Sequence, residues 1–287
     1  MNFPKRAAFS GYGEIITASV LWGFAGILAK MIHGMPAQSI IFYRVTFASI
    51  IFFVTLLISG NLGMIKLKDR KFYLVLFAIL QAGTMLAYFI SLLNASIAVA
   101  VLLLYTAPVY ITLFSPWLLK ERPTKKGIIA LFLALAGIYL IVDPGKLEFS
   151  SYSIGIIAGI VSGIAYAFQI MTSKYLSLQY SGYAQAFWGF IIAALILLPI
   201  SPVPLNVVIS NMNYLILLAI FPTILAVSLY FNGLKKVRAS SASILGLIEP
   251  VSAVILASLI LNEKIQGLEI IGGALILAGA ALVTRDK

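Results

Sequence analysis

The sequence contains no cysteine and a single histidine, His33, in 287 residues. The lack of cysteine excludes a disulfide framework, a zinc–thiolate cluster and a thiol nucleophile. Charged residues are also scarce, at 10% of the chain, against about 25% in ordinary globular domains. A water-soluble protein needs polar side chains over its surface. The shortage of charge therefore argues against a soluble enzyme, a nucleic-acid-binding protein and a disordered scaffold.

Hydrophobic residues, by contrast, make up 62% of the chain, and the mean hydropathy is +1.06. Ten mainly apolar runs approach the ~20 residues that a helix needs to cross a ~30 Å hydrocarbon core. The runs are continuously apolar rather than alternating, which disfavours a β-barrel. We predict an all-α integral membrane protein with ten transmembrane helices, at 13–32, 37–59, 72–93, 97–119, 127–143, 154–174, 183–200, 214–234, 241–261 and 268–284.

The basic residues predict the orientation of these spans. An even number of spans places both termini on one side of the membrane, and sixteen of the 20 Lys and Arg residues then lie on that side. Only Lys30, Lys146 and Lys264 lie on the other side, and Arg44 lies inside a span. Because basic residues concentrate in cytoplasmic loops, we predict a multi-pass protein of the cytoplasmic (inner) membrane with both termini cytoplasmic. The net charge of +11 is thereby explained without a nucleic-acid partner.

The two halves of the chain resemble each other when one is shifted by 142 positions. Residues 108–141 and 250–283 agree at eleven of 34 positions, including Pro108 with Pro250, Glu121 with Glu263, and Gly137 with Gly279. Tyr88 and Phe89 fall on Tyr230 and Phe231 with the same shift, and Lys30 falls on Lys174 with a shift of 144. Each half holds five spans, an odd number, so the second half is predicted to be inverted relative to the first. Inverted repeats are typical of secondary transporters. We place the repeats at 1–146 and 147–287.

Several short motifs resemble the drug/metabolite transporter (DMT) superfamily, in particular its EamA-type members with ten helices. They are Leu21-Trp22-Gly23, Phe42-Tyr43-Arg44, Pro108 followed by Glu121, Ile248-Glu249-Pro250-Val251, and Leu261-Asn262-Glu263-Lys264. The resemblance covers essentially the whole chain. It implies two inverted five-helix repeats, a central cavity lined by spans 1, 3, 4, 6, 8 and 9, and no cofactor or nucleotide-driven motor. Such proteins move amino acids and related metabolites, often outward.

Glu249 is the first candidate for a functional group, because it lies about eight residues inside the ninth span. A carboxylate at that depth costs a few kcal/mol unless it faces the protein interior and has a partner. Pro250 beside it removes a backbone donor and loosens the helix. Glu249 is either a proton-coupling or amine-binding carboxylate, or a structural carboxylate held by a Tyr or Ser across a helix interface.

Arg44 lies about seven residues inside the second span. It is a candidate clamp for a substrate carboxylate, although a structurally paired or snorkelling Arg is the preferred interpretation. Lys30 and Lys174, at span ends, are expected to snorkel to the interface. Glu121 and Glu263, at helix ends, are expected to link or cap helices.

Polar and aromatic residues inside the spans supply the rest of the predicted site. The candidate substrate-binding residues are Trp22, Gln81, Tyr88, Tyr105, Tyr166, Gln169, Tyr230 and Glu249. Tyr and Trp rings can hold an aromatic ring or a cationic amine. We predict a secondary transporter that moves a small metabolite, an amino acid or related amine, most simply outward and by alternating access.

Two other functions are weighed against this one. A channel or facilitated-diffusion pore for a small organic solute is the first, because channels also contain inverted repeats. An intramembrane enzyme is the second, but the sequence has no HExxH pair and no phosphate-binding Gly-Lys-Ser loop. The expected partners are a small-molecule substrate, membrane lipid and a proton as candidate coupling ion, with the chain a monomer or weak homodimer.

Overall fold

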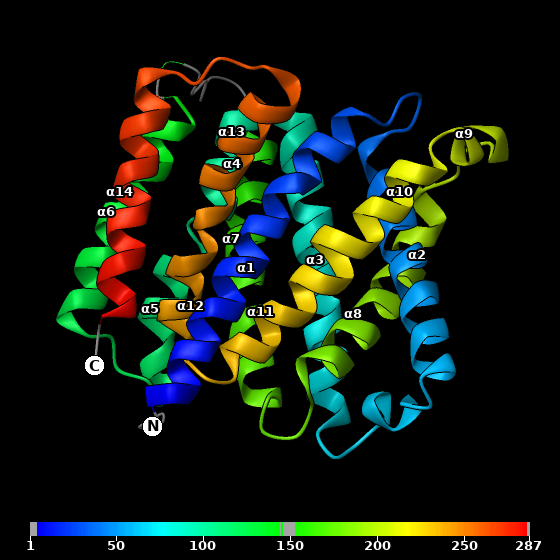
Figure 1. The fold of residues 1–287 in the computed structure, drawn as a ribbon, viewed down its shortest axis with the longest axis horizontal. Helices are drawn as coiled ribbons and strands as arrows, with labels where there is room; N and C mark the ends of the chain where they lie inside the picture. The colour runs from blue at the N-terminus through cyan, green and yellow to red at the C-terminus, as the bar shows by residue number, and fades with distance from the viewer. Residues whose placement is uncertain (1–4, 144, 146–152, 286–287) are drawn as a thin grey trace.

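The long helices of the described residues lie side by side in a bundle, some upright and some crossing it obliquely (Figure 1). The structure is a computed structural model that describes residues 5–143, 145 and 153–285. The first part contains α1 (Lys5–Lys30), α2 (Ala37–Ile58), the 3-10 turn η1 (Leu62–Ile65), α3 (Lys71–Asn94), α4 (Ile97–Leu104), α5 (Ala107–Leu118) and α6 (Lys125–Ile141). The second contains α7 (Ser153–Leu176), α8 (Gly182–Leu197), η3 (Leu198–Ile200), α9 (Leu205–Ser210), α10 (Met212–Ala219), the π-helical turn η4 (Ile220–Leu225), α11 (Ala226–Leu234), α12 (Ala239–Gly246), α13 (Ile248–Leu261) and α14 (Gly267–Thr284).

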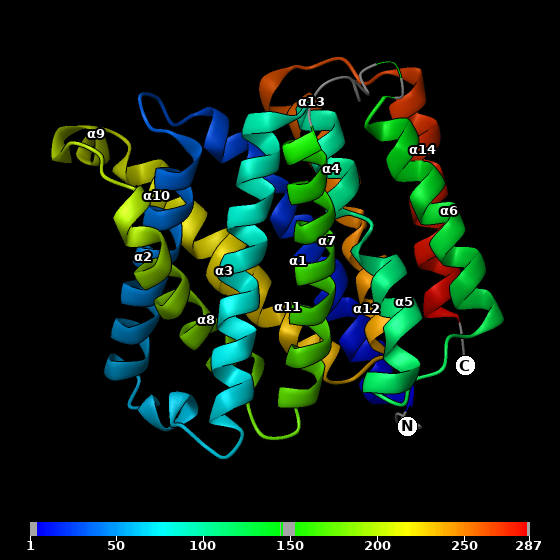
Figure 2. The ribbon, with the colours of Figure 1, turned by 180° about the vertical axis from the view of Figure 1, so that it is seen from behind.

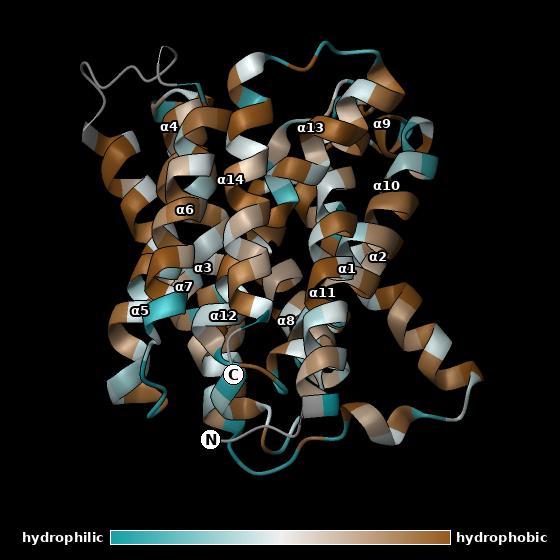
Figure 3. Ribbon diagram, turned by 60° about the vertical axis from the view of Figure 1, so that its left-hand side comes forward, coloured by the Kyte–Doolittle hydropathy of each residue, from teal (hydrophilic) through white to brown (hydrophobic). Residues whose placement is uncertain are grey.

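Nine helical segments of the described residues are long and apolar enough to cross a membrane. The predicted fifth span corresponds to α6, whose 17 residues rise only about 25 Å. Hydrophobic residues make up most of the length of the helices, and hydrophilic residues are more frequent in the connections at the two ends (Figure 3). Large apolar side chains such as Ile58, Phe72 and Trp117 are more than 70% exposed, which suits contact with lipid.

The predicted fourth and ninth spans are each broken into two helices. The break between α4 and α5 falls at Tyr105 and Thr106, and the break between α12 and α13 falls at Leu247. Pro108 and Pro250 follow these breaks within the first turn of α5 and α13. Proline lacks an N–H group and is accommodated in the first turn of a helix, where that group has no intrahelical partner.

The two parts of the chain repeat these local structures at the spacing that the sequence predicts. Helices α4 and α12 both have eight residues and begin 142 positions apart, and α6 and α14 also begin 142 positions apart. Lys120 and Asn262, again 142 apart, adopt the left-handed conformation with φ of 57° and 56°. The predicted boundary between the repeats, at 146 and 147, lies outside the described residues.

Small residues let α6 and α14 pack closely along their length. A Cβ atom on Gly137 would lie 2.5 Å from the Gly272 carbonyl oxygen, and one on Gly272 would lie 2.5 Å from the Gly137 oxygen. A Cβ atom on Gly279 would lie 2.8 Å from the Ala130 oxygen. Positions 137 and 279, and positions 130 and 272, are each 142 apart, so the two contacts are reciprocal. They also show that α6 and α14 run antiparallel.

Equivalent helices in the two parts of the chain also run in opposite directions elsewhere, as α1 and α7 show. Helix α1 begins, and α14 ends, at the same end of the bundle, which we call the termini end (Figure 1). Helix α1 runs away from the termini end, and α7 runs toward it (Figure 2). The glycines at 155, 159 and 163 of α7 pack against the end of α3 and against α4 inside the chain, as expected for close helix packing.

The α6–α14 contact predicts a matched pair of stability effects. Gly137→Ala would place a Cβ atom against the Gly272 backbone, so we expect it to lower the free energy of unfolding by about 1–3 kcal/mol. A Cβ atom on Gly13 in α1 meets nothing within 4 Å, so Gly13→Ala should leave thermal stability unchanged or raise it. Thermal unfolding of the detergent-solubilised variants measures both. An unchanged melting temperature for Gly137→Ala would contradict the close contact.

Candidate binding site

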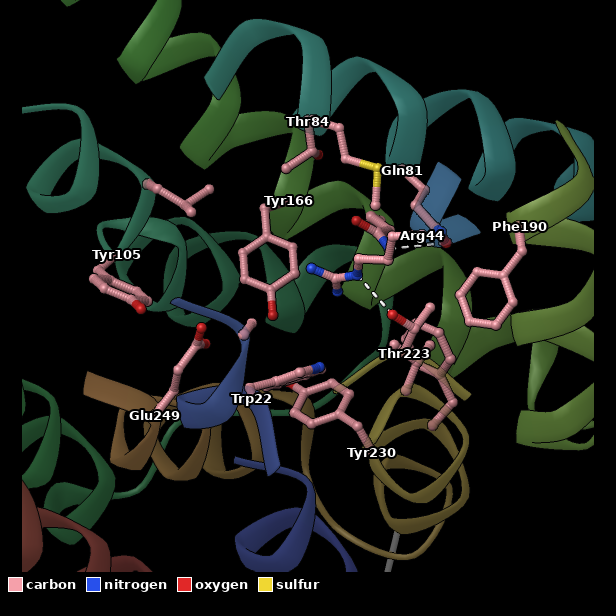
Figure 4. A pocket seen from close by; sticks show the side chains of 16 residues that line it. Trp22, Arg44, Gln81, Thr84, Tyr105, Tyr166, Phe190, Thr223, Tyr230 and Glu249 are labelled. Atoms are coloured by element: carbon pink, nitrogen blue, oxygen red, sulfur yellow. Dashed lines mark hydrogen bonds between the residues drawn. The ribbon is translucent and has the colours of Figure 1, made fainter. Parts of the chain in front are cut away.

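A cavity of about 200 Å³ lies between helices of both parts of the chain (Figure 4). This is room for several water molecules, so the cavity suits a small solute. The lining residues are Trp22, Ala25, Arg44, Gln81, Thr84, Met85, Leu104, Tyr105, Tyr166, Gln169, Phe190, Thr223, Val227, Tyr230, Phe231 and Glu249.

Seven of the eight predicted substrate-binding residues line this cavity, and so does Arg44. The seven come from α1, α3, α7, α11 and α13 and from the break after α4, and Arg44 comes from α2. Tyr88 is the exception. It lies on α3 one turn beyond the lining Thr84, is half-buried, and does not line the cavity. Positions 81, 84, 85 and 88 share one face of α3, so Tyr88 falls outside the cavity because it lies further along the helix axis, not because it faces another way.

Arg44 is held by a distorted part of the opposite half of the chain. Its Nε donates to the Thr223 hydroxyl at 2.6 Å, and its Nη2 donates to the Pro222 carbonyl at 3.4 Å. Thr223 in turn donates to the Leu218 carbonyl at 2.7 Å. Proline within η4 widens the helix locally, and such π-helical turns are frequent at functional sites. Arg44 therefore does not snorkel to the interface: it is paired inside the protein and lines the cavity.

Glu249 lies in the first turn of α13, immediately after the break at Leu247. Its carboxylate is directed into the cavity, on the side where the Tyr105 ring lies (Figure 4). The first turn of a helix favours a negative charge because its N–H groups point outward. The structure thus places one carboxylate and one guanidinium in the same cavity, on opposite sides of Tyr166 in this view (Figure 4).

Aromatic side chains form much of the wall between the two charges. The rings of Trp22 and Tyr230 pack with their centroids 4.9 Å apart, and Tyr230 also packs on Phe231 at 5.8 Å. Tyr230 is only 1% exposed, and its hydroxyl has no hydrogen-bond partner among the described residues. A buried polar group without a partner costs about 1–3 kcal/mol, so this hydroxyl is available to a ligand.

Amide and hydroxyl groups complete the polar part of the wall. The Gln169 Nε2 donates to the Gln81 Oε1 at 3.5 Å, a long contact that leaves both amides able to rearrange. Sequence reasoning missed several other lining residues: Ala25, Thr84, Met85, Leu104, Phe190, Thr223, Val227 and Phe231. Thr223 had a signal, since Pro222 interrupts an otherwise apolar span directly before it. The apolar lining residues had no such signal in the sequence, because they resemble the lipid-facing residues around them.

The four charged residues at span ends lie away from this cavity. Lys30 and Glu263 form an exposed ion pair at 2.8 Å. Lys174 was expected at the interface, but that expectation is wrong, because the residue is buried and lies 3.6 Å from Glu121. The Glu121 Oε2 accepts a hydrogen bond from the Ala239 N–H at 2.8 Å, at the start of α12. Its predicted capping role is thereby confirmed.

Comparison with known proteins identifies the family. Two stretches, residues 9–143 and 153–285, match the EamA-like transporter family. The chain belongs to this family. It is therefore a multi-pass membrane protein that transports a small molecule, and the predicted resemblance is confirmed.

Relatives with this EamA architecture match over almost their full length. An uncharacterized transporter of Archaeoglobus fulgidus is 31% identical over 96% of this chain and 97% of its own. The inner membrane transporter YicL of Salmonella typhimurium is 29% identical over 96% of each chain. The pseudopaline exporter CntI of Pseudomonas aeruginosa is 24% identical over 97% of each. A solved crystal structure with 21% identity has a TM-score of 0.81 over 96% of each chain and shows the same fold.

The unpartnered Tyr230 hydroxyl gives a test of the cavity in the ligand-free EamA protein. Tyr230→Phe removes a buried hydroxyl that has no partner, so the free energy of unfolding should stay unchanged or rise by about 1 kcal/mol. Tyr180 is the matched control, because it is equally buried but its hydroxyl accepts from the Lys68 N–H at 2.8 Å and donates to the Lys68 carbonyl at 2.7 Å. Tyr180→Phe should lower stability by about 1–3 kcal/mol. Equal losses in the two variants would show that Tyr230 has a structural partner.

Proposed function

We propose that the protein is a secondary transporter with ten membrane-spanning helices arranged as two inverted five-helix repeats. The repeated positions of α4 and α12, the matching left-handed residues Lys120 and Asn262, and the reciprocal contacts of α6 and α14 support this arrangement. The opposite directions of α1 and α7 support the inversion. With α6 counted as the tenth span, each half holds five. Transporters of this kind bind substrate between the repeats and expose the site to each side in turn.

The proposed orientation places the termini end in the cytoplasm and the protein in the cytoplasmic (inner) membrane. The bias of sixteen basic residues against three supports it, as does the inner membrane location of the relative YicL. Outward transport is the proposed direction, because the relative CntI is named an exporter. The proposed functional unit is the monomer, since the cavity is lined within one chain and the small residues of α7 pack internally.

The substrate that we propose is an amino acid or a related amine that also carries a carboxylate. The observation that supports it is the presence of Arg44 and Glu249 on one cavity of about 200 Å³. A substrate carboxylate would contact the Arg44 guanidinium, and a substrate ammonium would contact the Glu249 carboxylate. A cation alone would leave Arg44 without a ligand anion, and an anion alone would leave Glu249 without a ligand cation. Desolvating an unpaired charge is costly, so a zwitterion fits best.

Two features of Arg44 suit it to such binding. Its Nε and Nη2 are fixed by Thr223 and Pro222, which orients the guanidinium in advance. Its Nη1 makes no hydrogen bond within the described residues, and the group is directed into the cavity (Figure 4). The aromatic rings of Trp22, Tyr166 and Tyr230 would cover the apolar part of the substrate.

Energy coupling is proposed to run through Glu249. In the bound state its carboxylate neutralises the substrate ammonium, and in the empty state a proton is the smallest cation that can replace it. Exchange of one for the other at a single carboxylate would couple export to the proton gradient. Transport without coupling, by facilitated diffusion, is the alternative that the flux experiments below distinguish.

The proposed substrate class predicts a ranking of ligands. In a thermal-shift assay of the purified protein, zwitterionic amino acids should raise the melting temperature more than amines without a carboxylate or acids without an ammonium group. Arg44→Met should abolish the advantage of the zwitterion over the matched amine, whereas Lys30→Met, at an exposed residue away from the cavity, should retain it. An equal shift by all three ligand classes in the unaltered protein would contradict the proposal.

The proposed coupling role of Glu249 predicts that removing its carboxylate weakens the flux driven by a proton gradient. In proteoliposomes with an amino acid that passes the thermal-shift assay, flux should saturate, show counterflow and respond to a pH gradient. Glu249→Gln removes the charge that would bind a proton or an ammonium, so we expect proton-driven flux to fall at least about tenfold. Glu269→Gln is the control for the same chemical change, because Glu269 lies outside the cavity and caps the start of α14, where Gln can serve as well. Unchanged pH-dependent flux in Glu249→Gln would remove this residue from the mechanism, and unsaturable flux would favour a pore.

A further inference from the structure

Of the ion pairs that join the two halves of the chain, two correspond to each other and lie at opposite ends of the bundle. Lys174 at the end of α7 pairs with Glu121, which follows α5, and Lys30 at the end of α1 pairs with Glu263, which follows α13. Glu121 and Glu263 are 142 positions apart, and Lys30 and Lys174 are 144 apart. Each pair is therefore the counterpart of the other. The lysine comes from the second half of the chain in one pair and from the first half in the other.

The pair at the termini end is buried and makes further bonds. The side chains of Lys174 and Glu121 are only 7% and 4% exposed. The Lys174 Nζ donates to the Leu234 carbonyl at 2.6 Å and to the Val237 carbonyl, at the end of α11 and in the turn after it. The Glu121 carboxylate accepts from the first N–H of α12, at Ala239. A cation at a helix C-terminus and an anion at a helix N-terminus each interact favourably with the helix dipole. The pair therefore closes the turn between α11 and α12.

Within the described part of the chain, the side chains of the pair at the other end make no bonds of this additional kind. The side chains of Lys30 and Glu263 are 61% and 51% exposed. The turn that corresponds to the one between α11 and α12 lies between α3 and α4, where the Ser96 hydroxyl accepts from the Val99 N–H at 3.2 Å and caps α4 instead. Exposed ion pairs contribute little to stability, so this pair does not close its end of the bundle.

Other equivalent residues are also more buried at the termini end than at the opposite end of the bundle. Ile111 and Ser115 on α5 are completely buried, whereas their counterparts Ala253 and Ala257 on α13 are only half-buried. Helix α12, at the termini end, is buried almost throughout, whereas its counterpart α4 is mostly half-buried. The structure is therefore tightly packed at the termini end and loosely packed at the opposite end.

We propose that the two ion pairs are reciprocal latches, and that this structure is the state in which the latch at the termini end is closed. This inference rests on the proposed transport by inverted repeats. When the halves exchange conformations, the Lys174–Glu121 pair becomes exposed. Lys30 then reaches the carbonyls of Leu92 and Ala95, the counterparts of Leu234 and Val237, and Glu263 accepts from the Ile97 N–H, the counterpart of Ala239.

Reciprocity has an energetic consequence. Breaking a buried ion pair without replacement is strongly unfavourable, because it leaves buried charges uncompensated. If the counterpart closes as the first opens, one buried pair is present in each end state. The two states can then lie close in free energy, which repeated cycling requires.

The absence of cysteine from the chain gives a direct test by thiol labelling. Ser243 on α12 is 4% exposed and lies between the termini-end latch and the cavity. In membrane vesicles whose termini end faces the medium, Ser243→Cys should react slowly with a membrane-impermeant methanethiosulfonate reagent. Adding Glu121→Gln should raise the labelling rate at least about tenfold, because the opened state gains population. Lys174→Gln should do the same. Glu263→Gln, the same change in the counterpart latch, should not raise it.

A second measurement leaves the buried Lys174–Glu121 pair intact, in case variants of that pair do not fold. Size-exclusion chromatography of each variant shows whether it is folded. Lys30→Cys with Ala95→Cys should form an intramolecular cross-link with a short bismaleimide as the protein visits the opposite state, and the linked protein should label rapidly at an added Ser243→Cys. No rise in labelling in folded Glu121→Gln, or slow labelling of the linked protein, would overturn the latch. Labelling needs no substrate. Saturable flux with unresponsive labelling would therefore refute the latch alone, and responsive labelling with no flux would refute the proposed function.

Discussion

The constraint on which the structure depends is that lipid offers no partner for a backbone N–H or C=O group. A helix can be interrupted at membrane depth only where protein side chains or a polar cavity replace the lost bonds. The interruptions obey this rule: Tyr105 and Glu249 at the two helix breaks, and Thr223 in the π-helical turn η4, all line the same cavity. The Thr223 hydroxyl bonds a carbonyl of the preceding turn, and Arg44 bonds the Pro222 carbonyl. The irregular backbone and the binding site are therefore one feature.

The same constraint governs the charges. Arg44 and Glu249 lie on one cavity, and Lys174 lies against Glu121, so a charge buried in the bundle has an opposite charge on a neighbouring surface. In each case the two partners come from different halves of the chain. Electrostatic attraction therefore acts mainly between the halves, at their shared cavity and at the ends of the bundle. Packing of apolar helices, in contrast, has no hydrophobic driving force between lipid-exposed surfaces. The proposed movement of the halves would therefore change these few polar contacts more than the helices themselves.

The sequence predicted what depends on composition and spacing. Ten apolar runs, the repeat at 142 residues and half of the cavity residues were predicted, because polar side chains at membrane depth are rare and must face the interior. Features that depend on which residue lies across a helix–helix interface could not be predicted from the sequence. Lys174 lies at a span end like a snorkelling lysine, and only the carbonyls at the end of α11 reveal that it is buried. Pro250 indicated a weakened helix, but the break falls before it, because a proline belongs to the first turn of the new helix. The same holds at Pro108, where no break was predicted. Phe190 and Val227 are indistinguishable from lipid-facing residues until the fold is known.

The cavity wall combines positions that are repeated in the two halves of the chain with charged positions that are not repeated. Several wall positions are occupied by counterparts from the two halves: Trp22 and Tyr166 are 144 apart, Gln81 and Thr223 are 142 apart, and all four line the cavity. The charged positions are not repeated, since α8, the counterpart of α2, has no charged residue, and Ala107 is the counterpart of Glu249. In the proposed transport cycle, a repeated wall would allow the two halves to exchange shapes around the same volume. Unrepeated charges would fix the orientation of the proposed substrate, because Arg44 and Glu249 would stay on their own sides of the cavity in either state. A protein with symmetric charges would bind a zwitterion in two opposite orientations, and the divergence of these two positions removes that ambiguity.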